Sequence, residues 1–150
     1  MKISIYPSTI SDAFALAQLE RRCFPGDHLS LGQYRYFIRR PSAQVLTMMQ
    51  SDKVIGGAVL LFRRHSAIAR LYSIAIDPAF QGHGLGVELL AEVEAYAKGR
   101  RATLVRLEVR QDNQVAIQFY KKHGYLAFGE YEHYYEDGAP ALRMQKILIK

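Results

Sequence analysis

The sequence predicts an α/β protein in which a mixed β-sheet carries helices on both of its faces. Segments with strand character and amphipathic segments follow in the order strand, two helices, three strands, helix, strand, helix, two strands. A glycine-rich turn leads directly from the central strand into a helix, as is common in layered α/β folds. The 150 residues show no internal repeat and no linker, so we expect a single domain over residues 1–150.

The first part of the chain is expected to form one strand, two helices and a hairpin. Thr9, Ser11 and Asp12 can cap a helix that ends near Cys23, and Ser30 can cap a second helix over 31–39. The polar turn 51–53 joins two apolar runs into a hairpin. The strands of this part are expected at residues 2–6, 45–50 and 54–62.

The chain is organised around the stretch from Arg70 to Lys98. Its first part, 71–76, is an apolar run without helical spacing, which Asp77-Pro78 ends because proline cannot continue a strand ladder. From Leu85 the apolar residues recur on one helical face as far as Gly99, a typical C-terminal stop. We therefore predict a buried strand followed by an amphipathic helix.

Three glycines at alternate positions, Gly82, Gly84 and Gly86, lie between that strand and that helix. The N–H groups of a first helical turn have no intrahelical partner, and together with the helix dipole they form an anion site. A tight turn without a ligand is the plainer interpretation, but three glycines in this context favour phosphate. A Walker loop is excluded, because it needs Lys and then Ser or Thr where this chain has Val87 and Glu88.

A dinucleotide-binding turn is a weaker alternative. Its third glycine would have to stand at Val87, and Asp77-Pro78 lengthens a turn that should be tight. Glu108 does lie roughly 20 residues beyond the loop, where such folds carry a ribose-binding acid. This alternative therefore stays open at this point.

Charged residues alternate with apolar ones on the strand expected at 103–109. Arg106, Glu108 and Arg110 share one face of it. A solvated acid between two arginines is the ordinary interpretation of Glu108. The functional interpretation is a general base, because ligands of open α/β sheets bind at the carboxyl ends of strands. There a carboxylate could take a proton from an ammonium group, directly or through water.

A helix is expected over 113–123, where Asn113 and Tyr120 are seven residues apart. They share an azimuth at a separation of roughly 10 Å along the axis, so one face could hold a long ligand at two points. A helix cap for Asn113 and a packing ring for Tyr120 are the plainer alternatives. The last strands are expected at residues 125–135 and 141–149, with a turn at Asp137-Gly138 between them.

Several of these segments together resemble the GNAT family of N-acetyltransferases. Residues 81–86, Gln-Gly-His-Gly-Leu-Gly, resemble the pyrophosphate loop of that family, Gln/Arg-x-x-Gly-x-Gly/Ala. Residues 107–120, Leu-Glu-Val-Arg-x-x-Asn-x-x-Ala-Ile-x-x-Tyr, are similar to the second half of its signature. With Ser-Ile-Ala-Ile-Asp-Pro at 73–78, they look most like the branch that acetylates the N-terminal alanine of a ribosomal protein. The resemblance covers residues 71–144 and implies the GNAT fold.

The resemblance also implies that two sets of residues hold acetyl-CoA. The pantetheine arm would pair, like an added strand, with the main chain of Ile74, Ala75 and Ile76. The pyrophosphate would be held by Gln81, Gly82, His83, Gly84, Leu85, Gly86 and Val87. Asn113 would fix the arm near its thiol.

Catalysis would need Glu108 as the base and Tyr120 as the acid that protonates the departing thiolate. The acetyl group would then move directly to a primary amine, in the first place a protein or peptide N-terminal α-amine. A small-molecule amine and a non-catalytic acetyl-CoA sensor are the alternatives. Pro140 stands where the ribosomal-protein branch usually carries an acid, and no tryptophan follows Pro25. Both differences fall where the acceptor would bind, so they leave its identity open.

Composition sets further limits. The net charge of +6 favours an anionic partner, which could be a polyphosphate cofactor such as acetyl-CoA, an acidic substrate or nucleic acid. A nucleic-acid-binding module is therefore a rival that the charge allows, although we expect acetyl-CoA in preference to nucleic acid. Cys23 is the single cysteine, so no internal disulfide can form, and the histidines show no metal-ligand spacing. We expect no metal, no membrane segment, a cytoplasmic location, and a monomer or homodimer.

Overall fold

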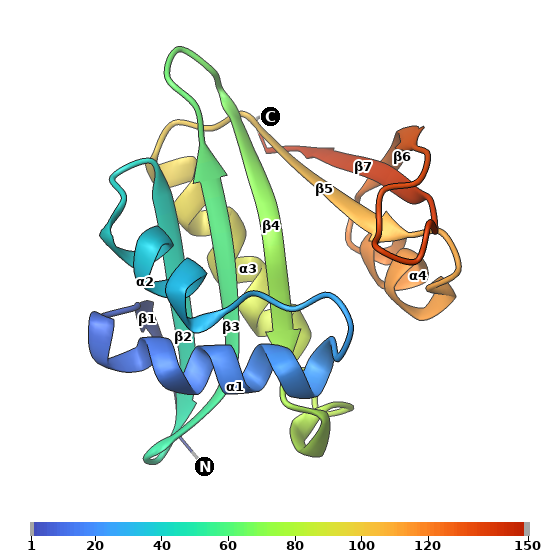
Figure 1. Cartoon of the computed structure of the whole chain (residues 1–150). Coiled ribbons are helices and arrows are strands. Elements are labelled where there is room, and N and C mark those ends of the chain that lie inside the picture. The colour runs from blue at the N-terminus through green and yellow to red at the C-terminus, as the bar shows by residue number, and fades with distance from the viewer. Residues whose placement is uncertain (1, 149–150) are drawn as a thin grey trace.

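The structure, a computed structural model, describes residues 2–148 and contains one seven-stranded sheet (Figure 1). The strands are β1 (Ile3–Pro7), β2 (Ala43–Gln50), β3 (Lys53–Phe62), β4 (Ile68–Ile76), β5 (Leu104–Arg110), β6 (Leu126–Tyr131) and β7 (Ala141–Ile147). The helices are α1 (Ala13–Cys23), α2 (Leu31–Arg39), α3 (Leu85–Gly99) and α4 (Gln114–Lys122). No helix among the described residues is long and apolar enough to cross a membrane.

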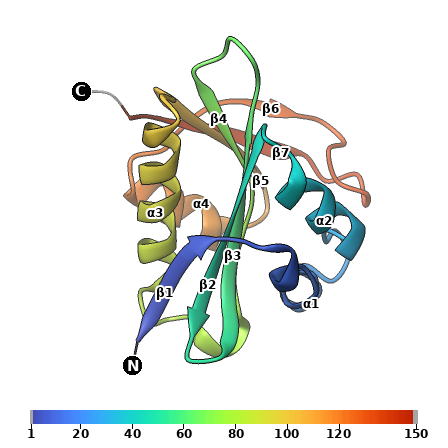
Figure 2. The same ribbon diagram turned by 90° about the vertical axis from the view of Figure 1, so that its left-hand side faces the viewer.

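The strand order is β1-β2-β3-β4-β5-β7-β6. Neighbouring strands are antiparallel except β4 and β5, which are parallel. A parallel pair needs a long crossover, and α3 supplies it. Figure 2 shows α1 and α2 on one face of the sheet and α3 and α4 on the other. The predicted mixed sheet with helices on both faces is confirmed.

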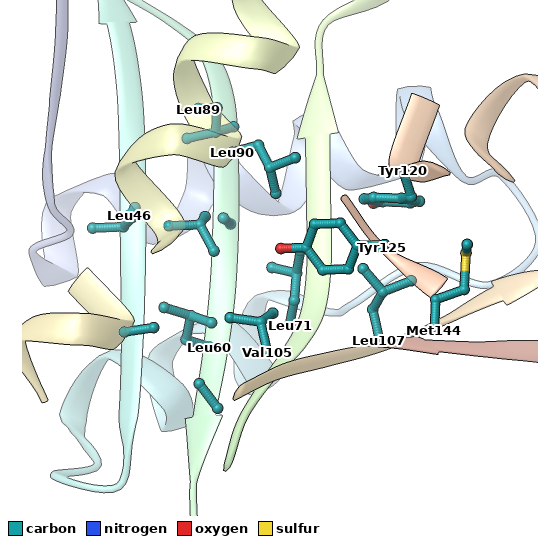
Figure 3. Close-up of a cluster of buried hydrophobic side chains, with 14 of the residues drawn as sticks. Leu46, Leu60, Leu71, Leu89, Leu90, Val105, Leu107, Tyr120, Tyr125 and Met144 are labelled. Carbon is teal, nitrogen blue, oxygen red and sulfur yellow. The ribbon is translucent and has the colours of Figure 1, made fainter. Parts of the chain in front are cut away.

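The main hydrophobic core lies between the sheet and the helices α3 and α4 (Figure 3). Leu89 and Leu90 of α3 and Tyr120 of α4 belong to one buried cluster with Leu60 and Leu71 of the sheet. Burying each leucine stabilises the fold by about 1.5–3 kcal/mol. This core fixes the position of α3, and with it the glycine loop that precedes the helix.

A second, smaller cluster lies under α1 and α2. The helix α1 comes so close to β3 that a Cβ atom at Gly57 would lie 2.6 Å from Cδ2 of Leu16. A larger residue at position 57 would therefore push α1 away from the sheet.

Two strand boundaries differ from the sequence prediction by three residues or more, and the others agree to within two residues. The strand β4 begins at Ile68, earlier than the expected residue 71. The strand expected over 125–135 ends at Tyr131, because the chain turns at His133, whose φ is 53°. Tyr134 and Tyr135, which suggested a longer strand, belong to the loop between β6 and β7. The last strand, β7, ends at Ile147, and Ile149 lies outside the described residues.

Asp77 closes the carboxyl end of β4. Its carboxylate accepts from the Ala79 N–H at 2.9 Å and pairs with Nη2 of Arg22 on α1 at 2.9 Å. Burial alone would raise the pKa of Asp77, but the Ala79 N–H and Arg22 outweigh it and hold the pKa below its ordinary value. This carboxylate therefore ties α1 to the start of the glycine loop.

Replacing Asp77 by Asn should destabilise the protein at neutral pH by about 1–3 kcal/mol, because a buried hydrogen-bonded charge is lost. The pKa of Asp77 is lower in the folded state than its ordinary value of 3.8. The stability that the carboxylate contributes is therefore complete at pH values above 3.8, and it is lost as the pH falls through the lower pKa of the folded state. Thermal unfolding curves of the variant and the native protein should therefore converge in acid. Asp52→Asn in the exposed β2–β3 turn is the control. A difference in melting temperature between Asp77→Asn and the native protein that stays the same at every pH would contradict this role of Asp77.

Candidate active site

The strands β4 and β5 separate halfway along β4, and a cleft opens between them. They pair only from Ile68 to Leu71 on β4, after which β4 keeps β3 and β5 keeps β7 as neighbours (Figure 1). Tyr72 is the extra residue of a β-bulge opposite Val59 and Leu60, and bulges bend a strand. The cleft has a volume of about 930 Å³.

The main chain of β4 presents alternate residues to this cleft. The Asp77 N–H donates to the Ile55 carbonyl of β3 at 2.8 Å. Because N–H and C=O groups in a strand point to the same side at every second residue, the main chain of Ala75 also faces β3. The main chains of Ile74 and Ile76 face the other side, where β4 has no neighbouring strand. Of the three β4 residues predicted to pair with the cofactor, Ile74 lines the cleft, and Ile76 faces the same open side of β4 beyond it.

The Ile76 carbonyl is already occupied by two protein donors. It accepts from Sγ of Cys23 at 3.3 Å and from Nε2 of Gln81 at 3.0 Å. Gln81 therefore secures the loop to β4 through its side chain. The N–H of Ile76 and both main-chain groups of Ile74 lie on the side of β4 that has no neighbouring strand.

The glycine loop ends in an exposed helix N-terminus. Gly82 and Gly84 have φ of 88° and 77°, a left-handed conformation that glycine adopts without strain. The Glu88 N–H is bonded to the Gly84 carbonyl at 3.3 Å, so the N–H groups of Leu85, Gly86 and Val87 precede the first intrahelical bond. These three donors and the helix dipole suit a phosphate group. Among the described residues, none of the loop lines the β4–β5 cleft itself.

Glu108 is buried in the wall of the cleft, with 6% of its side chain exposed. Its partner is Arg70 of β4, whose Nε and Nη2 lie 3.0 and 2.8 Å from Oε1. Burial works against the charge on Arg70, but Glu108 outweighs it and the pKa of Arg70 is raised. Arg106 donates to Gln145, and Arg110 donates to Asp112 and Asp137. The ordinary interpretation of Glu108, an acid solvated between those two arginines, is therefore wrong.

Tyr120 and Asn113 line the same cleft from the side of α4. Burial raises the pKa of Tyr120, and Tyr135 raises it further, so the hydroxyl keeps its proton in neutral solution. Oδ1 of Asn113 accepts from the Ala116 N–H at 3.1 Å, which caps α4. The plainer interpretation of Asn113, a helix cap, is thus confirmed, and the same residue also lines the cleft.

Sequence reasoning missed several residues of the cleft. Arg70 and Tyr134 join Glu108, since Nη2 of Arg70 donates to the Tyr134 hydroxyl at 2.7 Å. Glu20 of α1, which is 1% exposed, accepts from the Leu29 N–H at 3.1 Å and from the hydroxyls of Tyr34 and Ser73. No local pattern marks these residues, because their partners lie on distant elements.

Cys23 also lines the cleft. Burial, with the negative charges of Glu20 and Asp77, raises the pKa of its thiol to about 11. A thiol of that kind stays protonated at neutral pH, so it is a poor nucleophile. Within residues 2–148 no three His, Cys, Asp or Glu side chains are grouped as metal ligands.

The sequence matches the family model described as the acetyltransferase (GNAT) family over residues 13–125. The chain belongs to the GNAT family. This GNAT acetyltransferase is 30% identical to the N-alpha-acetyltransferase RimI of Mycobacterium tuberculosis over 148 residues, which are 96% of this chain and 92% of that protein. The resemblance to the family and to its ribosomal-protein branch is confirmed.

Solved structures confirm the GNAT fold. The ribosomal-protein-S18-alanine N-acetyltransferase from Escherichia coli has a TM-score of 0.89 at 24% identity, over 99% of this chain and 96% of that one. The PaiA N-acetyltransferase from Thermoplasma acidophilum, in complex with coenzyme A, has a TM-score of 0.82 at 21% identity, over 98% of this chain and 99% of that one.

Replacing Gly84 by Ala should weaken acetyl-CoA binding roughly tenfold. An L-residue pays about 1–2 kcal/mol for the left-handed conformation, so the loop spends less time in the shape that binds phosphate. Gly99→Ala is the matched control, because a Cβ atom meets nothing within 4 Å at either position and only Gly84 has a positive φ. Calorimetric titration with acetyl-CoA should separate the two variants, and equal affinities would refute the role of the loop.

Proposed function

We propose that the protein, acting as one domain, transfers an acetyl group from acetyl-CoA directly to the α-amine of a peptide or protein N-terminus. The observation that carries this proposal is that the cleft passes through the sheet. Tyr120 and Asn113 line it from the face of α4, and Glu20 and Gln33 line it from the face of α1 and α2. A thioester and an amine can therefore approach the same point from opposite faces.

The residues present fit acetyl-CoA, which supplies the activated acetyl group. The free N–H groups at the start of α3 suit its pyrophosphate. The main chains of Ile74 and Ile76 can bond an amide-containing arm as a neighbouring strand would. Asn113 is placed to meet the arm from α4, and an N–H of β4 can stabilise negative charge on the thioester oxygen.

Glu108 and Tyr120 provide the proton transfers. Glu108 accepts the proton that the ammonium group must lose, either directly or through a water molecule. Tyr120 donates a proton to the departing thiolate, and its raised pKa keeps that proton available. An α-amine, with a pKa of about 8, needs only modest help from such a base.

The acceptor end of the cleft is formed by two connections between elements. Residues 24–29 follow α1, and residues 134–137 lie between β6 and β7. Asp27 and Glu136 are among them and favour a positively charged acceptor. The preference for a peptide is supported by the names of the relatives, which are N-terminal acetyltransferases. A small cationic amine is the second candidate, because the same two acids suit it.

An acceptor screen tests the proposal. Peptides with Ala, Ser or Met at a free N-terminus are compared with the same peptides carrying a blocked N-terminus and an internal lysine, and with polyamines. Thiol release and mass spectrometry should show acetylation at the α-amine only. Acetylation of polyamines alone would favour the second candidate. Thermal stabilisation by acetyl-CoA without thiol release from any amine would indicate a sensor.

A further inference from the structure

Arg70 contacts Glu108 from near the end of the stretch over which β4 and β5 are paired. Its strand position is opposite Arg106, and only the Leu71–Leu107 pair follows before the cleft opens. Its guanidinium uses two nitrogens on a single oxygen, Oε1 of Glu108. The same Nη2 also holds the Tyr134 hydroxyl. Arg70 thus connects β4, β5 and the β6–β7 connection in one network.

We infer that Arg70 is a positioning residue, which fixes Glu108 by Oε1 so that Oε2 remains as the proton acceptor for the amine. This inference rests on the proposed function. Within the described residues no donor bonds Oε2, while the cleft runs past Glu108. The forked contact holds Oε1 in place, since a guanidinium is planar and its donors are fixed in direction.

The network joins the base to the acceptor side of the cleft. Tyr134 lies in the connection that lines the acceptor end. The guanidinium of Arg70 also lies over the Tyr72 ring, with Cζ 5.1 Å from the ring centroid. The bulge residue of β4 thus contributes a cation–π contact to Arg70.

Arg70 makes the ion pair with Glu108. Other charged or titratable groups surround Glu108 on each side. They are Tyr72 of β4, Arg106 and Arg110 of β5, Arg143 of β7, Tyr120 of α4, and Tyr134 and Tyr135 of the β6–β7 connection. Arg106 and Arg110 are bonded elsewhere, and Arg143 stacks on the Phe128 and Tyr131 rings. Arg70 is therefore the cation in direct contact with this carboxylate.

Removing the guanidinium would leave a nearly buried carboxylate without a counter-charge, and such a group holds its proton more tightly. The active, unprotonated base would then appear only at higher pH. We expect Arg70→Gln to lower kcat/KM at neutral pH by roughly tenfold or more and to move the acidic limb of the pH–rate profile upward. Arg70→Lys keeps the charge but loses the fork, so it should keep the acidic limb in place and lower kcat.

The experiment measures kcat/KM against pH for these variants, with the amine that the native protein acetylates fastest. Arg106→Gln is the matched control, because Arg106 is on the same face of the sheet and bonds Gln145 instead of Glu108; its profile should match the native one. Arg70→Gln is also combined with Glu108→Gln. If Arg70 acts through Glu108, adding its substitution to Glu108→Gln should cost less than about twofold.

Several outcomes would overturn the inference. These are a native profile in Arg70→Gln, a full additional loss in the double variant, or a parallel loss of acetyl-CoA affinity. If Arg70→Gln does not fold, Arg70→Lys decides, and a native kcat in that variant would refute the positioning role. A native protein that acetylates no amine would refute the proposed function, and this inference with it.

Discussion

The separation of β4 from β5 is the constraint on which the site depends. Beyond Leu71 one side of β4 has lost its neighbour, so main-chain groups of Ile74 and Ile76 are not paired within the sheet. Unpaired main-chain groups are costly when buried, and here the cleft keeps them accessible to water or a ligand. The bulge at Tyr72 and the turn of β5 toward β7 produce this arrangement from ordinary strand pairing.

Buried carboxylates hold the walls of the cleft in place. Glu20 joins α1 to α2 and to Ser73 of β4, Asp77 joins β4 to α1, and Glu108 joins β5 to β4. Each accepts from at least one donor on another element, which offsets part of the cost of burying its charge. Loss of one would affect the width of the cleft as well as local stability, because each contact bridges two elements that border it.

The sequence was sufficient for the order of the elements and for the glycine loop, because caps, glycines and periodicity are local signals. It was insufficient where contacts between segments far apart in the chain determine the structure. The strand expected to reach residue 135 ends at Tyr131, and Tyr134 and Tyr135 belong to the loop that follows it. Glu108 has arginines two residues away on either side, yet its partner is Arg70, 38 residues earlier. The pairing of β4 with β5, which brings Arg70 to Glu108, depends on the whole sheet. No local sequence pattern predicts it.

The central claim is that an extended ligand occupies the open side of β4 and the start of α3. Amide hydrogen exchange followed by NMR, with and without coenzyme A, tests it most directly. The N–H groups of Ile74, Ile76 and 85–87 should exchange more slowly when coenzyme A is added, while the Ala75 N–H, which faces β3, should not change. Protection confined to other parts of the chain, or no protection at all, would contradict the account.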